Sequence, residues 1–356
     1  MRPRSRYLWA AVTASTLLAS GLVGGLGVAS AAPASSAGAV TPARVYAPYF
    51  EAYLSGSLAT ASKQSGVRFA TLAFVQAAGK TGSAACTLTW NGDKNQPVSK
   101  GAYRTGIQHL RSVHGDAIVS FGGFSADNGG TEIADSCHSV PAIAAAYEQL
   151  VRTYNLHRLD MDIEAKSVNN AAGIGRRNRA ITMLEAWAKK RGIPLWIQFT
   201  LGVEPSGFDQ PTLNILRNAV KNHTEVNSIN LMVFDYYLGK EKHPLNMSAD
   251  AIKAANTVHS QIARVYPKVG SAGLWRRLGF TMLPGIDDYP GKTEITSAAD
   301  ARTIMKFARA HGMDFLSIWA LQRDNGGCPG AIDSNTCSGI KQATWTFSHL
   351  LEPYTG

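Results

Sequence analysis

Apolar runs of strand length recur eight times along the chain, and segments with helical apolar spacing lie between them. The runs that we expect to form strands are 44–53, 66–77, 116–125, 156–165, 194–203, 226–237, 278–287 and 313–322. Apolar residues recur at three- and four-residue spacing, which predicts amphipathic helices, in 141–154, 176–192, 249–266 and 297–312. Two of these segments end at a glycine, Gly192 and Gly312, and a glycine in the left-handed conformation commonly ends a helix. Alternation of strand and helix favours a parallel sheet.

About eight strand–helix units occupy residues 44–356, and they use up this part of the chain. This number predicts an α/β protein that forms one closed (β/α)8 barrel, a TIM barrel, and not an open sheet. We find no linker in this range and expect a single catalytic domain. In such a barrel, functional side chains stand at the carboxyl ends of the strands. The loops after the second and third predicted strands are long, and we expect them to wall one side of a cleft.

The first 31 residues have the layout of a secretory signal peptide. Arg2, Arg4 and Arg6 precede an uncharged run rich in Ala, Leu, Gly and Val that reaches Ala29-Ser30-Ala31. Glycines, serines and threonines interrupt this run, so a permanent membrane anchor is the weaker interpretation. We expect a signal peptide over 1–31, a short Ala/Ser/Pro-rich leader over 32–43, and a secreted, extracellular protein that has no membrane association after cleavage.

Composition excludes a disordered chain, because 45% of the residues are hydrophobic and only 17% are charged. The formal net charge is +10, but lysines and arginines are spread along the chain without a basic run interleaved with aromatic residues. We therefore attribute the positive charge to a solvated surface and expect no nucleic-acid partner. We also expect a monomer.

Four cysteines in an exported protein should be oxidised. Cys328 and Cys337 flank a loop rich in Pro, Gly, Asn and Ser, and would close a short ring. Cys86 and Cys137 then remain to pair, joining two loops. No His or second Cys lies at ligand spacing beside any of the four, so the sequence predicts two disulfides and no metal site.

Three acidic residues occupy every second position of the otherwise apolar run LDMDIEA, residues 159–165. Because side chains alternate along a strand, Asp160, Asp162 and Glu164 share one face, and the apolar residues between them share the other. In a barrel the acidic face points into the lumen, with Glu164 nearest the mouth. Like charges stacked roughly 6 to 7 Å apart are costly to bury, and separated pKa values with a shared proton relieve that cost.

A surface-facing acidic strand, or a structural cluster paired to buried cations, is the alternative interpretation. Lys166 lies beyond Glu164, and Arg158 precedes the acids on the same face. Clusters of ionisable groups of this kind concentrate at functional sites, and we favour a catalytic role.

Four motifs together resemble the family 18 glycoside hydrolases, whose members are chitinases and endo-β-N-acetylglucosaminidases. The motifs are LDMDIE, the preceding SFGG at 120–123, LMVFDYY at 231–237 and the Trp319 of SIWALQRDN. They correspond to the family's patterns DGxDxDxE, SxGG and MxYD or MxMDY, and to its strand-eight Trp. All four fall on the expected strands, in order. The sequence departs from the family at His157 and Arg158, and at Phe234, where many members have Tyr.

The resemblance implies retaining, substrate-assisted hydrolysis, in which the N-acetyl oxygen of the substrate attacks C1 and the enzyme supplies no nucleophile. Glu164 would be the general acid and then the general base. Asp162 would accept a hydrogen bond from the acetamido N–H and stabilise the oxazolinium intermediate. Asp160, deeper in the lumen, would share a proton with Asp162.

The resemblance also implies substrate-binding residues. Trp319 would stack under the sugar, and Asp235 and Tyr236 would contact the acetamido carbonyl or the sugar hydroxyls, beside Met232 of the same motif. From their positions on the first, second and fifth predicted strands, the remaining candidates for the cleft are Tyr49, Gln76 and Gln198.

The predicted function is hydrolysis of β-1,4-N-acetylglucosamine linkages in chitin or its oligosaccharides, without a cofactor. One alternative keeps this chemistry but acts on the chitobiose core of N-glycans. A second is a noncatalytic sugar-binding barrel, which the presence of Glu164 disfavours.

Overall fold

The computed structural model describes residues 42–236, 245–288, 293–332 and 334–356. The expected signal peptide and nearly all of the expected leader lie outside these residues, as does Tyr237, the last residue of the sixth predicted strand. The described residues all belong to one compact unit.

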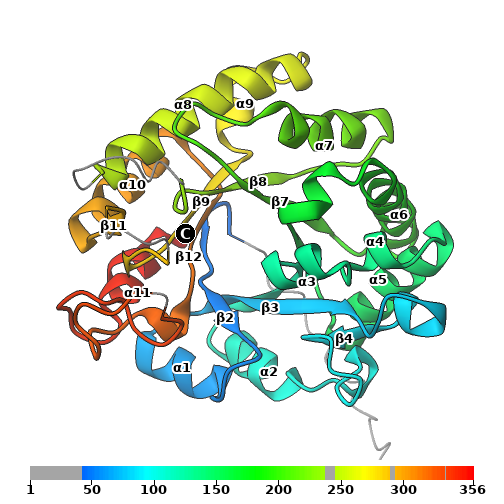
Figure 1. Cartoon of the computed structure of the whole chain (residues 1–356), viewed down its shortest axis with the longest axis horizontal. Helices are drawn as coiled ribbons and strands as arrows, with labels where there is room; N and C mark the ends of the chain where they lie inside the picture. The colour runs from blue at the N-terminus through cyan, green and yellow to red at the C-terminus, as the bar shows by residue number, and fades with distance from the viewer. Residues whose placement is uncertain (1–41, 237–244, 289–292, 333) are drawn as a thin grey trace, which may run out of the picture. The chain divides into compact units, whose positions relative to one another are not determined.

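Nine strand segments form a parallel sheet that closes into a barrel (Figure 1). The strands are β1 (Val45–Tyr46), β2 (Tyr49–Glu51), β3 (Phe69–Ala77), β5 (Asp116–Gly122), β6 (Arg158–Ile163), β7 (Trp196–Gly202), β8 (Ser228–Met232), β9 (Leu278–Met282) and β12 (Phe315–Ile318). β1 and β2 are two parts of the first predicted strand. Because β1 pairs with β12 and β2 pairs with β3, this first strand closes the sheet on both sides. All eight predicted strands are therefore present, and the predicted (β/α)8 fold is confirmed.

Most helices surround the strands on the outside of the barrel, whereas α3 (Phe124–Gly129) lies inside this ring of helices, in the loop after β5 (Figure 1). The other helices are α1 (Leu58–Ser65), α2 (Arg104–Ser112), α4 (Ile133–Ser136), α5 (Val140–Tyr154), α6 (Ala171–Lys190), α7 (Gln210–Lys221), α8 (Met247–Val265), α9 (Ser271–Trp275), α10 (Ala298–His311) and α11 (Thr346–Leu351). Gly192 and Gly312, the predicted caps, have φ values of 65° and 67°, the left-handed conformation that favours glycine.

Short elements extend the loops. They are the strands β4 (Leu88–Trp90), β10 (Gly285–Ile286) and β11 (Ile295–Thr296), and the 3-10 helices η1 (Gly82–Cys86), η2 (Val98–Lys100), η3 (Ala165–Asn169), η4 (Leu321–Arg323) and η5 (Glu352–Tyr354). β4 pairs antiparallel with the end of β3, and β10 pairs antiparallel with β11.

The two faces of β6 differ as the alternation predicts. Leu159, Met161 and Ile163 are at most 1% exposed and belong to the main apolar core. Asp160 and Asp162 lie on the opposite face, which points into the barrel, in register with Ser120 and Gly122 of β5. The fold therefore places the acidic residues inside a closed sheet, away from the helices.

Both expected disulfides are present. Cys86–Cys137 joins the end of η1 to the residue that follows α4, and Cys328–Cys337 closes a ring after β12. Across the described ranges, no helix is both long and apolar enough to cross a bilayer.

The two disulfides differ in the length of chain that they close, 51 against 9 residues. Loop-closure entropy grows with that length, so replacing Cys86 and Cys137 by Ser should lower the free energy of unfolding by about 4 kcal/mol. The same change at Cys328 and Cys337 should cost about 2.5 kcal/mol. Denaturant unfolding of both double variants measures the difference, and a larger loss for the 328–337 pair would contradict the expectation.

Candidate active site

A cavity of about 620 Å³ opens at the carboxyl ends of the barrel strands. Side chains from several strand ends and from the loops after them line it, among them Asp162, Glu164 and Trp319. Three more residues proposed for substrate contact, Tyr49, Gln76 and Met232, also line the cavity, as does Asp235.

Asp160 lies below the cavity and is completely buried. Its Oδ2 accepts hydrogen bonds from the Tyr49 hydroxyl at 2.8 Å and the Ser120 hydroxyl at 2.7 Å. Its Oδ1 accepts from the Thr200 hydroxyl at 2.7 Å and from Nε2 of Gln198 at 3.1 Å. Burial raises the pKa of Asp160, and these four hydrogen bonds oppose that rise. Because these four donors all point at its oxygens, they favour the charged form of the Asp160 carboxyl group.

Asp162 is 4% exposed and lines the cavity floor. Burial raises its pKa well above the usual value, and the negative charges of Glu164, Asp160 and Asp127 raise it further. Its Oδ1 has no hydrogen-bond partner among the described residues. Of the three carboxyl groups, Asp162 is therefore the one whose surroundings most favour the protonated form.

Glu164 follows the last residue of β6 and is partly exposed to the cavity. Its carboxylate accepts a hydrogen bond from the backbone N–H of Phe124, and burial raises its pKa to about 7. Its own backbone N–H donates to Oδ2 of Asp127 at 2.6 Å. The chain turns away immediately after it, because Ala165 has a φ of 43°. Glu164 is thus fixed at the cavity with a pKa suited to proton transfer at neutral pH.

Gly122 allows β5 to pass close to β6 at this point. Its φ is 86°, and a Cβ there would collide with the backbone oxygen of Asp162. Both the positive φ and the close approach of the Asp162 backbone therefore require glycine at position 122.

Aromatic rings form another part of the cavity wall. Phe74 and Trp319 lie nearly parallel, with their centroids 5.5 Å apart and 19° between their planes. Tyr49 meets Trp319 edge-on at 5.4 Å. At the rim, Phe124 is 59% exposed although its ring is large and apolar. Such surfaces suit the apolar faces of sugar rings.

A second acidic group lies at the cavity beyond β8. Burial raises the pKa of Asp235 to about 9, and the hydrogen bond with Asp287 and the negative charge of Asp287 add to this rise. The charges of Asp288 and Glu294 make smaller contributions. Phe234, at the position where the family has Tyr, lines the cavity and has no hydroxyl to offer.

Two residues that the sequence places at the cleft do not line it. Gln198 is buried one layer lower, paired in register with Asp160. Tyr236 is 1% exposed, and its backbone N–H donates to Glu294. Its expected contact with the sugar is not supported, because β8 ends at Met232 and strand alternation no longer applies beyond it.

Sequence reasoning missed Asp127, which accepts the backbone N–H of Glu164, and Phe124, which lines the cavity. Both lie on α3, in the loop after β5, and their segment has no periodicity that could have identified them.

No family model matches the chain. A probable bifunctional chitinase/lysozyme of Escherichia coli (strain K12) is 29% identical over 327 residues, which cover 88% of this chain and 35% of that protein. Endochitinase 11 of Metarhizium anisopliae is 30% identical over 295 residues, which cover 80% of this chain and 53% of that protein. The chain thus spans between a third and about half of the length of these relatives.

Solved structures of similar fold include the catalytic domain of a hyperthermophilic chitinase from Pyrococcus furiosus. It is 26% identical, has a TM-score of 0.75, and the match covers 88% of this chain and 95% of that one. A GH18 chitinase from Pseudoalteromonas aurantia, 15% identical with a TM-score of 0.51 over 79% of this chain and 96% of that one, shares the fold. Together with the motifs on β5, β6, β8 and β12, these similarities show that the chain belongs to the family 18 glycoside hydrolases.

Proposed function

We propose that this protein is a secreted, retaining glycoside hydrolase that cleaves β-1,4 linkages between N-acetylglucosamine units of chitin or chito-oligosaccharides. The observation that carries the proposal is the environment of the three carboxyl groups on and just after β6. Four hydrogen bonds favour the charged form of Asp160, burial and neighbouring charges raise the pKa of Asp162, and burial raises the pKa of Glu164 at the cavity to about 7. Three carboxyl groups on and just after one strand thus lie in three different electrostatic environments.

In the first step, Glu164 donates its proton to the glycosidic oxygen as the C1–O bond breaks. The acetamido oxygen of the same sugar attacks C1 from the opposite face, which gives an oxazolinium ion and a Glu164 carboxylate. In the second step, Glu164 takes a proton from water, the water oxygen attacks C1, and the bond from C1 to the acetamido oxygen breaks. Two inversions leave the configuration retained.

Asp162 orients the attacking group. Its carboxyl lies between Asp160 and Glu164 along β6, and its Oδ1 has no partner within the described part of the chain. An acetamido N–H in the cavity would donate to this oxygen. As positive charge develops on the acetamido group, the proton on Asp162 moves toward Asp160 and the resulting anion stabilises the oxazolinium.

The aromatic wall holds the sugar for this attack. Trp319 and Phe74 present ring surface to the cavity, and stacking against a pyranose supports the geometry that brings the acetamido oxygen to C1. Crystal structures of catalytic-site mutants of a Pyrococcus furiosus chitinase domain contain bound chito-oligosaccharides. This similarity supports the same class of ligand here.

The test is hydrolysis of chitohexaose followed by proton NMR from the first minutes. We expect shorter oligosaccharides whose new reducing ends are initially β-anomers. Initial α-anomers would contradict the retaining mechanism, and the absence of cleavage would overturn the proposal. A high-mannose glycoprotein offered beside chitohexaose separates the N-glycan alternative, which is favoured if only the glycoprotein is cleaved. Binding without turnover would indicate the noncatalytic alternative.

The pH dependence of kcat/KM should follow Glu164. Its raised pKa means that the protonated, active acid predominates below pH 7, so activity should fall above about pH 7, by roughly tenfold per pH unit. Initial rates on chitohexaose between pH 5 and pH 9.5 measure this fall in kcat/KM. Asp235→Asn serves as a control, because Asp235 has a pKa raised to about 9 and its removal should leave this fall near pH 7. A constant rate across this range would contradict the assignment of Glu164.

A further inference from the structure

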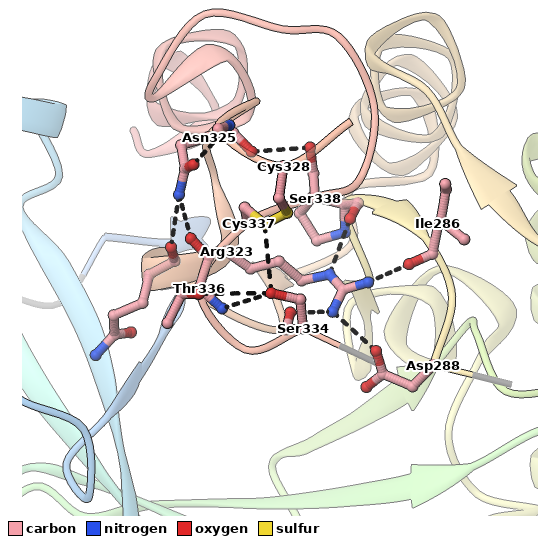
Figure 2. The surroundings of a disulfide bond; sticks show 12 residues. Ile286, Asp288, Arg323, Asn325, Cys328, Ser334, Thr336, Cys337 and Ser338 are labelled. Atoms are coloured by element: carbon pink, nitrogen blue, oxygen red, sulfur yellow. Dashed lines mark hydrogen bonds and ion pairs between the residues drawn. A yellow bond between two sulfur atoms is a disulfide. The ribbon is translucent and has the colours of Figure 1, made fainter. Parts of the chain in front are cut away.

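The chain beyond Trp319 brings a disulfide-closed ring to the cavity. Residues 328–337 are closed by Cys328–Cys337, and Asn335 inside this ring is exposed and lines the cavity. Figure 2 shows the ring beside Arg323, four residues after Trp319. Asn335 is not part of any motif in the sequence analysis, and the mechanism above makes no use of it.

The ring is held at Ser334 and Thr336, the two neighbours of Asn335 in the sequence (Figure 2). Nη1 of Arg323 donates to the backbone oxygen of Ser334, and Nδ2 of Asn325 donates to the backbone oxygen of Thr336. With the disulfide next to Thr336, these contacts fix the backbone that carries Asn335. An exposed side chain on a surface ring is thereby given a set position, as a binding group requires.

The Arg323 guanidinium also reaches a second cavity residue. The Arg323 side chain is 1% exposed, and its Nη1 pairs with Oδ1 of Asp288 at 2.8 Å. Its Nε donates to the backbone oxygen of Pro284 at 3.0 Å, and its Nη2 donates to that of Ile286. One buried cation therefore connects the ring to the segment after β9 and orients Asp288, which lines the cavity with 28% of its side chain exposed.

Burying a guanidinium is costly unless all its charge is compensated. Here three backbone oxygens and one carboxylate provide that compensation, and what the arrangement fixes is a pair of polar groups at the cavity. An amide and a carboxylate offer donors and acceptors suited to hydroxyl and acetamido groups, and neither is suited to stacking.

We propose that Asn335 and Asp288 form a polar subsite for an N-acetylhexosamine unit next to the unit that contacts Glu164, and that Arg323 and the Cys328–Cys337 ring position it. The inference rests on the proposed function and adds to it the residues that select where along an oligosaccharide cleavage occurs. Arg323 is a positioning residue, since it reaches the sugar only through Asp288 and the ring.

The test compares wild type with Asn335→Ala on chitohexaose. Loss of the amide should raise KM about three- to tenfold with a smaller change in kcat, and should shift the ratio of dimer, trimer and tetramer among the first products. Arg323→Lys, and replacement of both ring cysteines by Ser, should shift the product ratio in the same direction. Neither should add to the effect of Asn335→Ala, because all three changes act on one subsite.

Ile332→Ala is the matched control, because Ile332 lies in the same ring, is 41% exposed and does not line the cavity. It should leave both KM and the product ratio unchanged. If Asn335→Ala cleaves chitohexaose with the wild-type KM and product ratio, the subsite is overturned while the proposed function stands. If wild type neither binds nor cleaves the oligosaccharide, both fail. The product ratio separates positioning from stability, since a fold that is merely weakened loses activity at all bonds alike.

Discussion

Replacing Glu164 by Gln is expected to lower kcat on chitohexaose by about three to four orders of magnitude, while the protein stays folded. Gln has nearly the same shape, and its amide oxygen can still accept the hydrogen bond from the Phe124 backbone N–H. It has no proton to give to the glycosidic oxygen, so the leaving sugar must depart as an alkoxide. KM should change much less, because the aromatic wall is untouched.

Glu51→Gln is the matched control for this variant. Glu51 is fully buried on β2, burial raises its pKa to about 7, and it does not line the cavity. Its Oε1 accepts a hydrogen bond from Tyr53 at 2.5 Å, which a Gln side chain can keep. If Glu164→Gln keeps kcat within tenfold of wild type, or if Glu51→Gln loses as much, the acid has been assigned to the wrong residue.

The barrel and the inward carboxyl groups could be predicted because both depend on the backbone. A strand turns alternate side chains to opposite faces whatever the tertiary contacts, so Asp160 and Asp162 had to share a face. Eight strand patterns with helices between them leave few other ways to close a sheet. This reasoning does not extend to Tyr236, which was placed at the cleft by the family resemblance, because β8 has already ended and Asp235 adopts a φ of 52°.

The electrostatic differences between the three acids could not be predicted, since they depend on residues distant in sequence. The four donors to Asp160 come from β2, β5 and β7, and Asp127 reaches the backbone of Glu164 from α3. Sequence spacing indicated a shared proton but not which residue holds it. The contacts favour Asp162, because four donors are directed at Asp160 and, among the described residues, none is directed at Oδ1 of Asp162.

Replacing Asp162 by Asn is expected to lower kcat by about two to three orders of magnitude with little loss of stability. The Asn side chain can accept the acetamido N–H only in one orientation, and it cannot become an anion as positive charge develops on the oxazolinium. Stability should hold because the surroundings of Asp162 raise its pKa and so favour the neutral form, and Asn is likewise neutral. Rates on chitohexaose and denaturant unfolding of the same preparation measure the two effects.

Asp160→Asn provides the contrast, since it should lower stability as well as kcat, because an amide cannot take the proton that Asp162 gives up. Its carboxylate accepts from four donors, and an amide would direct its own N–H groups at two of them, leaving buried hydrogen-bonding groups unpaired. The expected loss is about 1 to 3 kcal/mol of unfolding free energy. If Asp162→Asn instead loses the stability and Asp160→Asn keeps it, the proton lies on Asp160 in the empty site. The order of charges along β6, on which the mechanism depends, would then be reversed.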